Sequence, residues 1–274
     1  MNFKGSSSQL FIAIIKQTSM DTSAINSRIS HLTFLCPHRK YMHHNKIMSF
    51  TPFMSLKPSA HKVLEVTNVP KITCYHDTWL DLMAINHLSQ NLQAVAGIQI
   101  EEKGYDGLLE TCKEVTVKFD SVQQRQLSLE GLARSIPKEI FPLLKALVPH
   151  CKFTRELLAK FTGLFFAWLV GPSELKESEF NGTSEKNVVH VKKCRFLESS
   201  NCVGMCTNLC KFPTQTFIKD SLGMPITMVP NFEDMSCDMI FGEEPPTPDE
   251  DPATKQPCYK LCKINKRHTT ERCS

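Results

Sequence analysis

Hydrophobic residues recur at three- and four-residue intervals between residues 75 and 170, and this spacing predicts a series of amphipathic helices. The first helix should begin at Thr78, because Thr78 and Asp81 have the spacing of a capping box, and it should end at Gly97. The pattern predicts further helices, separated by Gly, Pro or polar clusters, over residues 105–119, 122–135, 137–147 and 152–170.

The last of these helices ends in an uninterrupted apolar run, residues 164–170. Crossing a bilayer takes about twenty apolar residues, so this run is too short for a transmembrane span. We expect it to pack in the core. The alternatives are the wall of a lipid-binding cavity or a surface that makes peripheral contact with a membrane.

The pattern changes after residue 171. Residues 171–187 are polar and interrupted by Gly and Pro, which is typical of a linker. Short strands are predicted over residues 187–196, 225–232 and 236–242, a helix over residues 202–222, and an exposed extended connection over the acidic, Pro-rich residues 243–257.

These elements predict an α+β fold with a mainly helical N-terminal layer and a small Cys-rich region containing a few short strands and one helix. The expected division is a leader (residues 1–62), the helical region (75–171), a linker (172–187), the Cys-rich region (188–262) and a tail (263–274). With 274 residues, of which 41% are hydrophobic, the chain has ample material for a buried core.

The positive net charge of +4 belongs to the leader. Residues 1–62 contain eight Lys and Arg, fourteen Ser and Thr and one acidic residue, which is the composition of an organelle transit peptide. The alternative is a native tail with no targeting role. The remaining residues have a formal net charge of about −3, so the charge does not favour nucleic-acid binding.

Seven of the twelve cysteines lie between residues 194 and 262. If residues 202–222 form a helix, Cys202, Cys206 and Cys210 share one face, because each four-residue step turns by only about 40° from a full turn. These thiols could ligate one metal, with Cys237 as the fourth ligand. Weaker candidate ligands are Cys194, Cys258 and Cys262.

The residues leave the role of these cysteines open. Iron, mononuclear or in an iron–sulfur cluster, suits a set of thiolates from distant segments. Zinc would more commonly show Cys-x2-Cys pairs, while the repeated Cys-x3-Cys spacing could also mark disulfides. Burial as small apolar side chains is a further alternative.

Other catalytic signals are weak. The sequence has no nucleotide-binding glycine loop, serine nucleophile elbow or zinc-protease motif. His87 interrupts the apolar side of the first helix and is a weak candidate for an acid or base, although a hydrogen-bonded core histidine is the more ordinary interpretation. His190 precedes Cys194 by four residues, a separation of about 13 Å on a strand, which does not favour joint ligation.

Several longer stretches resemble the plant plastid β-carotene isomerase family of strigolactone biosynthesis. The stretches are "AINHLSQ" (84–90), "FFAWLVGPSE" (165–174), "NVVHVKKCRFLESSNCVGMCTNLCK" (187–211), "FIKDSLGMP" (217–225), "MVPNFEDMSCDMIFGEEPP" (228–246) and "KQPCYKLCK" (255–263). The resemblance extends from about residue 75 to residue 262 and is dense after residue 161, whereas residues 99–149 match less well.

The resemblance implies a plastid, iron-containing enzyme that interconverts all-trans and 9-cis β-carotene. Its product would pass to carotenoid cleavage dioxygenases on the route to carlactone and strigolactones. The resemblance does not assign catalytic residues. Alternatives are a paralogue acting on another carotenoid, a non-catalytic carotenoid or lipid carrier, and a zinc-stabilised interaction module.

Overall fold

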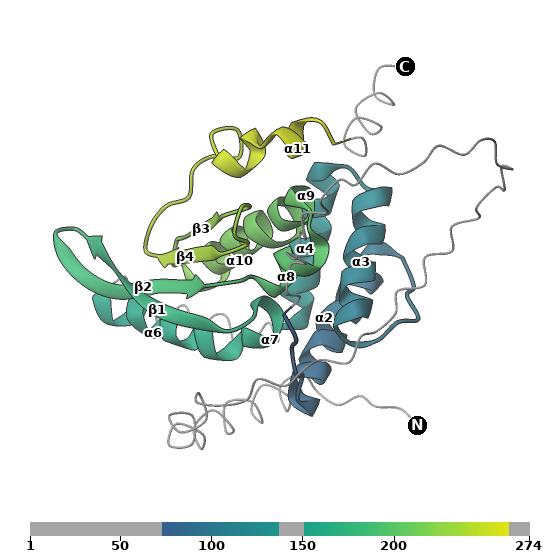
Figure 1. Ribbon diagram of the computed structural model, residues 1–274, viewed down its shortest axis with the longest axis horizontal. Coiled ribbons are helices and arrows are strands. Elements are labelled where there is room, and N and C mark those ends of the chain that lie inside the picture. Colours follow the sequence, from purple (N-terminus) through teal and green to yellow (C-terminus); the bar gives the residue numbers. More distant parts are fainter. Residues whose placement is uncertain (1–72, 137–150, 263–274) are drawn as a thin grey trace, which may run out of the picture. The chain divides into compact units, whose positions relative to one another are not determined.

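In a computed structural model, the structure of the protein is described for residues 73–136 and 151–262. The expectations for the leader (1–62), the helix over residues 137–147 and the tail (263–274) lie outside these residues. The described residues from His76 onward belong to one compact unit (Figure 1).

Three helices form one layer of this unit: α2 (Trp79–Ala96), α3 (Gly104–Lys118) and α4 (Ser121–Ser135). All three were predicted, and the ends of α2 are confirmed in detail. Thr78 and Asp81 form the capping box, and Gly97 adopts the left-handed conformation that ends the helix. Both α3 and α4 pack against α2.

The predicted helix over residues 152–170 is present as α6 (Lys152–Phe165) followed by the single turn α7 (Ala167–Val170). The break falls at Phe166, whose backbone leaves the helical region. The apolar run over residues 164–170 was predicted to be buried. Its last residue, Val170, is buried, whereas Leu164 is 49% exposed.

The segment predicted as a linker is a β-hairpin. Strands β1 (Ser173–Phe180) and β2 (Thr183–Val191) pair antiparallel, so the linker assignment of residues 172–187 is wrong. Asn181 and Gly182 form the two-residue turn with positive φ values of 50° and 75°. An Asn-Gly turn of this kind matches the twist of paired strands, which is why this sequence closes a hairpin.

Two further predicted strands complete the sheet. β3 (Ile226–Pro230) and β4 (Cys237–Phe241) are present, and the antiparallel order is β1-β2-β4-β3. Helix α6 packs along β1, β2 and β4 (Figure 1).

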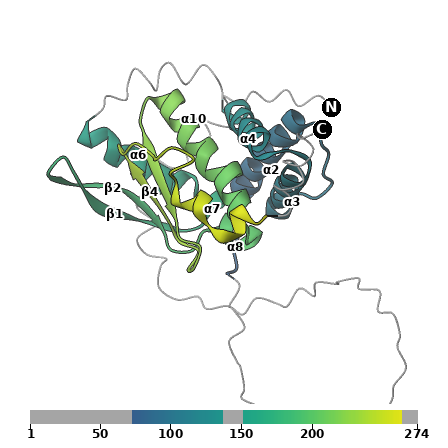
Figure 2. The same ribbon diagram turned by 90° about the horizontal axis from the view of Figure 1, so that it is seen from above.

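The predicted helix over residues 202–222 is present but not uniform. A short helix α8 (Arg195–Ser200), which was not predicted, precedes α9 (Val203–Met205), the π-helix η2 (Cys206–Lys211) and α10 (Phe212–Leu222). Figure 2 shows α10 between α4 and the sheet, and α10 packs against both α4 and β3. The helical layer and the Cys-rich region therefore meet along α10.

The acidic, Pro-rich connection is less exposed than predicted. It contains the 3-10 turn η3 (Pro252–Lys255) and leads into α11 (Pro257–Lys260). Asp251 is fully buried, and its Oδ2 atom lies 2.5 Å from Nζ of Lys211. This ion pair fixes the connection against the π-helix.

The α+β fold class is confirmed. A core cluster of buried residues includes side chains from α2 and α3, from β2, β3 and β4, and from the helices between them. No helix within the described ranges has the length and apolar character needed to cross a membrane.

Candidate functional site

A small cavity of about 50 Å³ lies where the helical layer meets the π-helix. Two thiols line it, Cys112 from α3 and Cys210 from η2. The other lining residues are Leu88, Leu92, Leu108, Ser128, Gly131, Leu132, Leu169, Phe196, Leu209 and Thr214. The lining is therefore mostly aliphatic.

Five cysteines form a thiol cluster around this part of the core: Cys112, Cys194, Cys206, Cys210 and Cys237. All five belong to the core cluster or pack against it, and each is free of disulfide bonds. Cys206 and Cys210 of η2 and Cys237 of β4 lie in, or pack against, the same core cluster, while the predicted ligand set that they form with Cys202 stays a prediction.

Burial keeps these thiols protonated. It raises the pKa of Cys112 and of Cys210 to about 12, and the pKa of Cys206 and Cys237 well above the ordinary value. Lys211 acts in the opposite direction on the last two, but its effect is smaller than that of burial. Neutral thiols add little polarity, so the cavity suits a hydrocarbon better than a charged ligand.

The other predicted ligands have different surroundings. The Sγ atom of Cys202 accepts a weak hydrogen bond from the Met205 N–H at 3.5 Å and caps α9. Cys258 is exposed and Cys262 is partly buried, both in the C-terminal segment. The wider turn of the π-helix also changes the angle between Cys206 and Cys210 from that expected of an α-helix.

Within residues 73–136 and 151–262, no three or more His, Cys, Asp or Glu side chains are arranged to hold a metal ion. The thiol cluster therefore does not present a ready ligand set, and ligation would require the raised pKa values of its members to be overcome. Iron ligation by Cys202, Cys206, Cys210 and Cys237 stays a prediction.

The two histidines considered in the sequence analysis, His87 and His190, have polar partners nearby. The Nε2 atom of His87 lies 3.3 Å from Nδ2 of Asn91, one turn further along α2. His190 Nδ1 lies 2.6 Å from Oδ1 of Asp238, its cross-strand partner on β4. Neither histidine lines the cavity.

The sequence did not reveal a polar network that surrounds the π-helix. Arg125 of α4 donates hydrogen bonds to Asn208 and Tyr259, and its guanidinium lies 4.3 Å from the centre of the Phe212 ring. Asn208 in turn donates to Gln124. These partners are far apart in sequence, so no local pattern could have paired them.

A second unpredicted contact holds the other side of the cavity. Arg195 of α8 forms a two-pronged ion pair with Asp77, at 2.5 and 2.8 Å, and donates to the carbonyl of Trp168. Its guanidinium also stacks on the ring of Tyr105, whose hydroxyl donates to the Leu169 carbonyl. This set fixes α7 and α8 beside α3.

Comparison with known proteins places the sequence of this chain in a family. Residues 168–250 match the family model described as "Beta-carotene isomerase D27-like, C-terminal". Over 248 residues, the chain is 51% identical to "Beta-carotene isomerase D27, chloroplastic" from Medicago truncatula, which covers 85% of this chain and 98% of the relative. The chain belongs to the D27-like β-carotene isomerase family.

A relative of the same name from Arabidopsis thaliana is 52% identical over 207 residues, covering 75% of this chain and 78% of the relative. The region matched by the D27-like family model contains the β-sheet, the π-helix and four members of the thiol cluster, but not Cys112. No solved structure matches the chain significantly.

Proposed function

We propose that the chain is a plastid β-carotene isomerase that interconverts the all-trans and 9-cis forms. The observation that carries the proposal is the 51% identity over nearly the whole length of a relative named as that isomerase. The aliphatic and neutral character of the cavity agrees with a hydrocarbon substrate. By the same family resemblance, the 9-cis product would supply cleavage dioxygenases on the route to carlactone and strigolactones.

The plastid location has two supports. Both relatives are named chloroplastic, and the leader is basic, rich in Ser and Thr and poor in acids. A fluorescent fusion of the full chain should accumulate in plastids, and a fusion starting at residue 63 should not.

The cavity suits only part of a carotenoid. Pockets that enclose small-molecule ligands usually have volumes of about 300–1,000 Å³, far more than the 50 Å³ found between the helices. This cavity can therefore surround a short part of the polyene at most, and the remainder would lie outside it. Isomerisation needs the order of one double bond to fall while the flanking groups are held.

Isomer analysis in the dark tests the activity. The full chain is incubated with all-trans or 9-cis β-carotene in detergent micelles, and the isomers are separated by chromatography, with heat-denatured protein as the control. We expect both starting isomers to approach one common ratio. An unchanged ratio would indicate a carrier, and change with a different carotenoid alone would indicate a paralogue with another substrate.

A matched pair of variants tests the cavity. Cys210→Leu places a larger side chain at the cavity wall, and we expect it to lower the isomerisation rate at least tenfold. Cys151→Leu makes the same change at an exposed position and should leave the rate unchanged. Circular dichroism and thermal unfolding establish that both variants are folded. Equal rates in folded Cys210→Leu and wild type would remove the cavity from the proposal.

Elemental analysis tests the predicted iron. Family resemblance implies a bound iron that could supply one-electron chemistry, and Cys206 and Cys237 are the deeply buried members of the predicted ligand set. Protein purified without oxygen should contain iron, and Cys206→Ser should lose it while the matched variant Cys151→Ser, at an exposed cysteine outside the candidate ligands, keeps it. Wild-type protein without iron would reject this part of the proposal.

A further inference from the structure

Helix α6 buries several polar side chains against the protein. The buried residues of α6 are Thr154, Arg155, Ala159 and Thr162. Arg155 forms a two-pronged ion pair with Glu185 of β2, with N–O distances of 2.7 and 2.6 Å, and both side chains are largely buried. Leu158 also packs against the core, but a surface helix normally leaves polar side chains such as Thr154 and Arg155 in water, so this packing is unusual.

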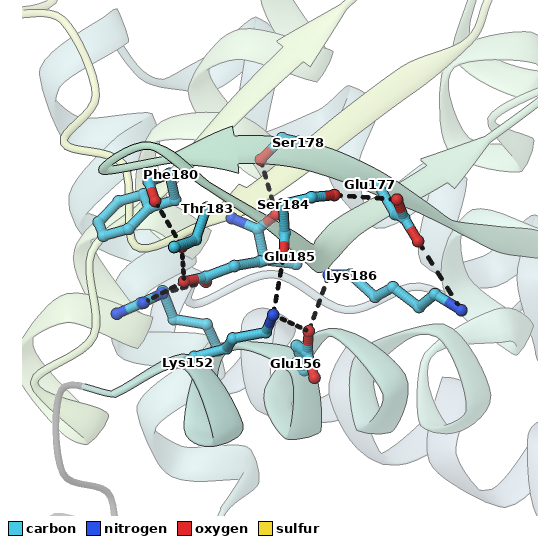
Figure 3. Close-up of polar contacts among 11 residues, drawn as sticks. Lys152, Glu156, Glu177, Ser178, Phe180, Thr183, Ser184, Glu185 and Lys186 are labelled. Carbon is cyan, nitrogen blue, oxygen red and sulfur yellow. Dashed lines mark hydrogen bonds and ion pairs between the residues drawn. The ribbon is translucent and has the colours of Figure 1, made fainter.

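Figure 3 shows how the β1–β2 hairpin holds α6 in this orientation. Lys152 Nζ donates to the carbonyl of Ser184 at 2.8 Å, and Glu156 accepts the backbone N–H of Lys186 at 3.0 Å. Together with the Arg155–Glu185 pair, these contacts fix three polar positions of α6 on one strand. Rotation of the helix about its axis would break all of them.

The opposite side of α6 presents a row of large apolar side chains to the outside. We call this the outward row: Phe153 (72% exposed), Leu157 (51%), Phe161 (37%) and Leu164 (49%). The members are spaced by four, four and three residues, which places them along one face. Single exposed apolar residues are ordinary, but a continuous row of this kind marks an interaction surface.

The charges beside the outward row favour an anionic lipid surface. Lys160 is exposed on the same helix. Lys152 donates to the hairpin and lies 3.9 Å from Glu156, the one carboxylate of α6, so these two charges offset each other. Helices that lie in the membrane interface combine an apolar face of Phe and Leu with flanking Lys or Arg, as α6 does. The substrate of the proposed function is a hydrocarbon, which dissolves in membranes rather than in water.

Aromatic rings connect the outward row to the cavity. Phe161 stacks on Phe165 at 5.0 Å between ring centres, Phe165 meets Phe166 at 4.9 Å, and Phe166 lies 6.3 Å from Trp168. The next residue, Leu169, lines the cavity. A series of aromatic rings thus follows the chain from the exposed helix to a residue that lines the cavity.

We propose that the outward row of α6 docks on the surface of an anionic bilayer, and that carotenoid enters along the aromatic rings that follow it. This inference rests on the proposed function for its substrate, but docking itself can be measured without any carotenoid. The occupant is lipid; a second copy of the chain is the competing outcome of the test.

Vesicle flotation tests the docking. The full chain is mixed with vesicles of phosphatidylcholine alone or with phosphatidylglycerol added. We expect it to float with the anionic vesicles, and the triple variant Phe153→Ser, Leu157→Ser, Leu164→Ser to lose at least tenfold in the bound-to-free ratio. Lys160→Glu should reduce binding to anionic vesicles and leave the weaker binding to neutral vesicles unchanged.

The matched control is Val117→Ser with Val122→Ser, which removes two apolar side chains that are 52% and 66% exposed on α3 and α4. This control should float like the wild type. The docking proposal is overturned if the wild type stays unbound, if the triple variant floats equally well, or if the control loses binding to the same extent. It is also overturned if light scattering shows a dimer that the triple variant converts to a monomer.

Activity separates docking from catalysis. The triple variant should isomerise β-carotene in detergent micelles at the wild-type rate but work at least tenfold more slowly on β-carotene dissolved in vesicles. Vesicle binding by a chain that isomerises nothing would leave docking supported and reject the proposed function. Equal loss in micelles and vesicles would reject docking as the role of the outward row.

Discussion

Arg155 and Glu185 show how single residues fix the position of an entire helix. Their side chains are only 10% and 2% exposed, and the Arg155 guanidinium also lies 4.1 Å from the centre of the Phe180 ring. A buried charge is tolerated only when a partner compensates the loss of water. The pair therefore matters less for net stability than for the damage that follows when one partner is removed.

Replacing Glu185 tests this compensation. Glu185→Gln keeps the shape but leaves the Arg155 cation without its counter-charge, so we expect the free energy of unfolding at pH 7 to fall by about 3 kcal/mol. Urea titration followed by circular dichroism measures it. Glu177→Gln, at an exposed ion pair with Lys186, is the control and should behave like the wild type.

The Arg155–Glu185 pair also predicts that the free energy of unfolding depends on pH. Hydrogen bonding to Arg155 lowers the pKa of Glu185 below its usual 4.5, so the folded state favours the carboxylate. Its stabilisation is fully present above the unfolded-state pKa and is lost as pH falls through the lowered folded-state pKa. The difference in unfolding free energy between wild type and Glu185→Gln should therefore shrink below about pH 4.5, and a constant difference would contradict the assignment.

Cys151 is expected to react with alkylating reagents much more readily than the buried members of the thiol cluster. It is exposed, and a hydrogen bond with Thr154 lowers its pKa, whereas burial raises the pKa values of Cys206 and Cys237. With iodoacetamide at pH 7.5, Cys151 should react faster than the exposed Cys258, while the buried thiols stay unmodified in the native protein.

Mass spectrometry of labelled peptides measures these rates. The variant Thr154→Val removes the hydrogen bond to Cys151 and should slow labelling at that position without affecting Cys258. Rapid labelling of Cys206 or Cys237 in native protein would show that these two thiols are not buried as described.

Secondary-structure elements differ in how much of them the local sequence determines. The ends of α2 were predictable because each depends on residues within one turn: Thr78 and Asp81 at the start, and Gly97 at the end. The Asn181–Gly182 turn was also readable, but the charged residues on both faces of β1 concealed the usual alternation of a strand. The π-helix has no comparable local signal, because its surroundings come from α4 and from the C-terminal segment.

The connection between η2 and the C-terminal segment can be tested through Lys211. Its side chain is 4% exposed and pairs with the fully buried Asp251. Lys211→Met leaves that carboxylate buried without a counter-charge, so we expect a loss of about 3–5 kcal/mol in unfolding free energy. Limited proteolysis should also cut residues 243–257 faster than in the wild type.

Two further variants separate charge from packing. The double variant Lys211→Met, Asp251→Leu removes both charges and should recover most of the lost stability. Lys219→Met breaks an exposed ion pair with Glu244, for which the expected change is within about 1 kcal/mol. If Lys211→Met were as mild as Lys219→Met, the buried pair would not fix the connection.

At the scale of the whole molecule, one core contains residues of both the helical region and the Cys-rich region, which were predicted as separate regions. The core cluster contains Cys112 and Val115 of α3 together with Met239 and Phe241 of β4. The sequence predicted that cysteines from distant segments would share one metal, and two of them, Cys206 and Cys237, lie in the same core. It could not show whether they would take up ligand geometry, since that depends on side-chain directions set by the complete core.

A shared core predicts one cooperative unfolding transition. Pulsed alkylation across a urea series should expose Cys112, from the helical layer, and Cys237, from the sheet, at the same midpoint. That midpoint should coincide with the one measured by circular dichroism. Two separate midpoints would instead support independent folding of the helical and Cys-rich regions.

The exposure of large apolar side chains on α6 has a practical consequence for protein engineering. Polar residues at Phe153 or Leu157 would remove apolar area from water without disturbing the hairpin contacts, so screens for yield and thermal tolerance should favour them. Such screens would improve the purified sample while erasing the face that we infer meets the membrane. Laboratory selection for yield and thermal tolerance would then favour polar residues at the same four positions where natural selection in the plastid would favour large apolar ones.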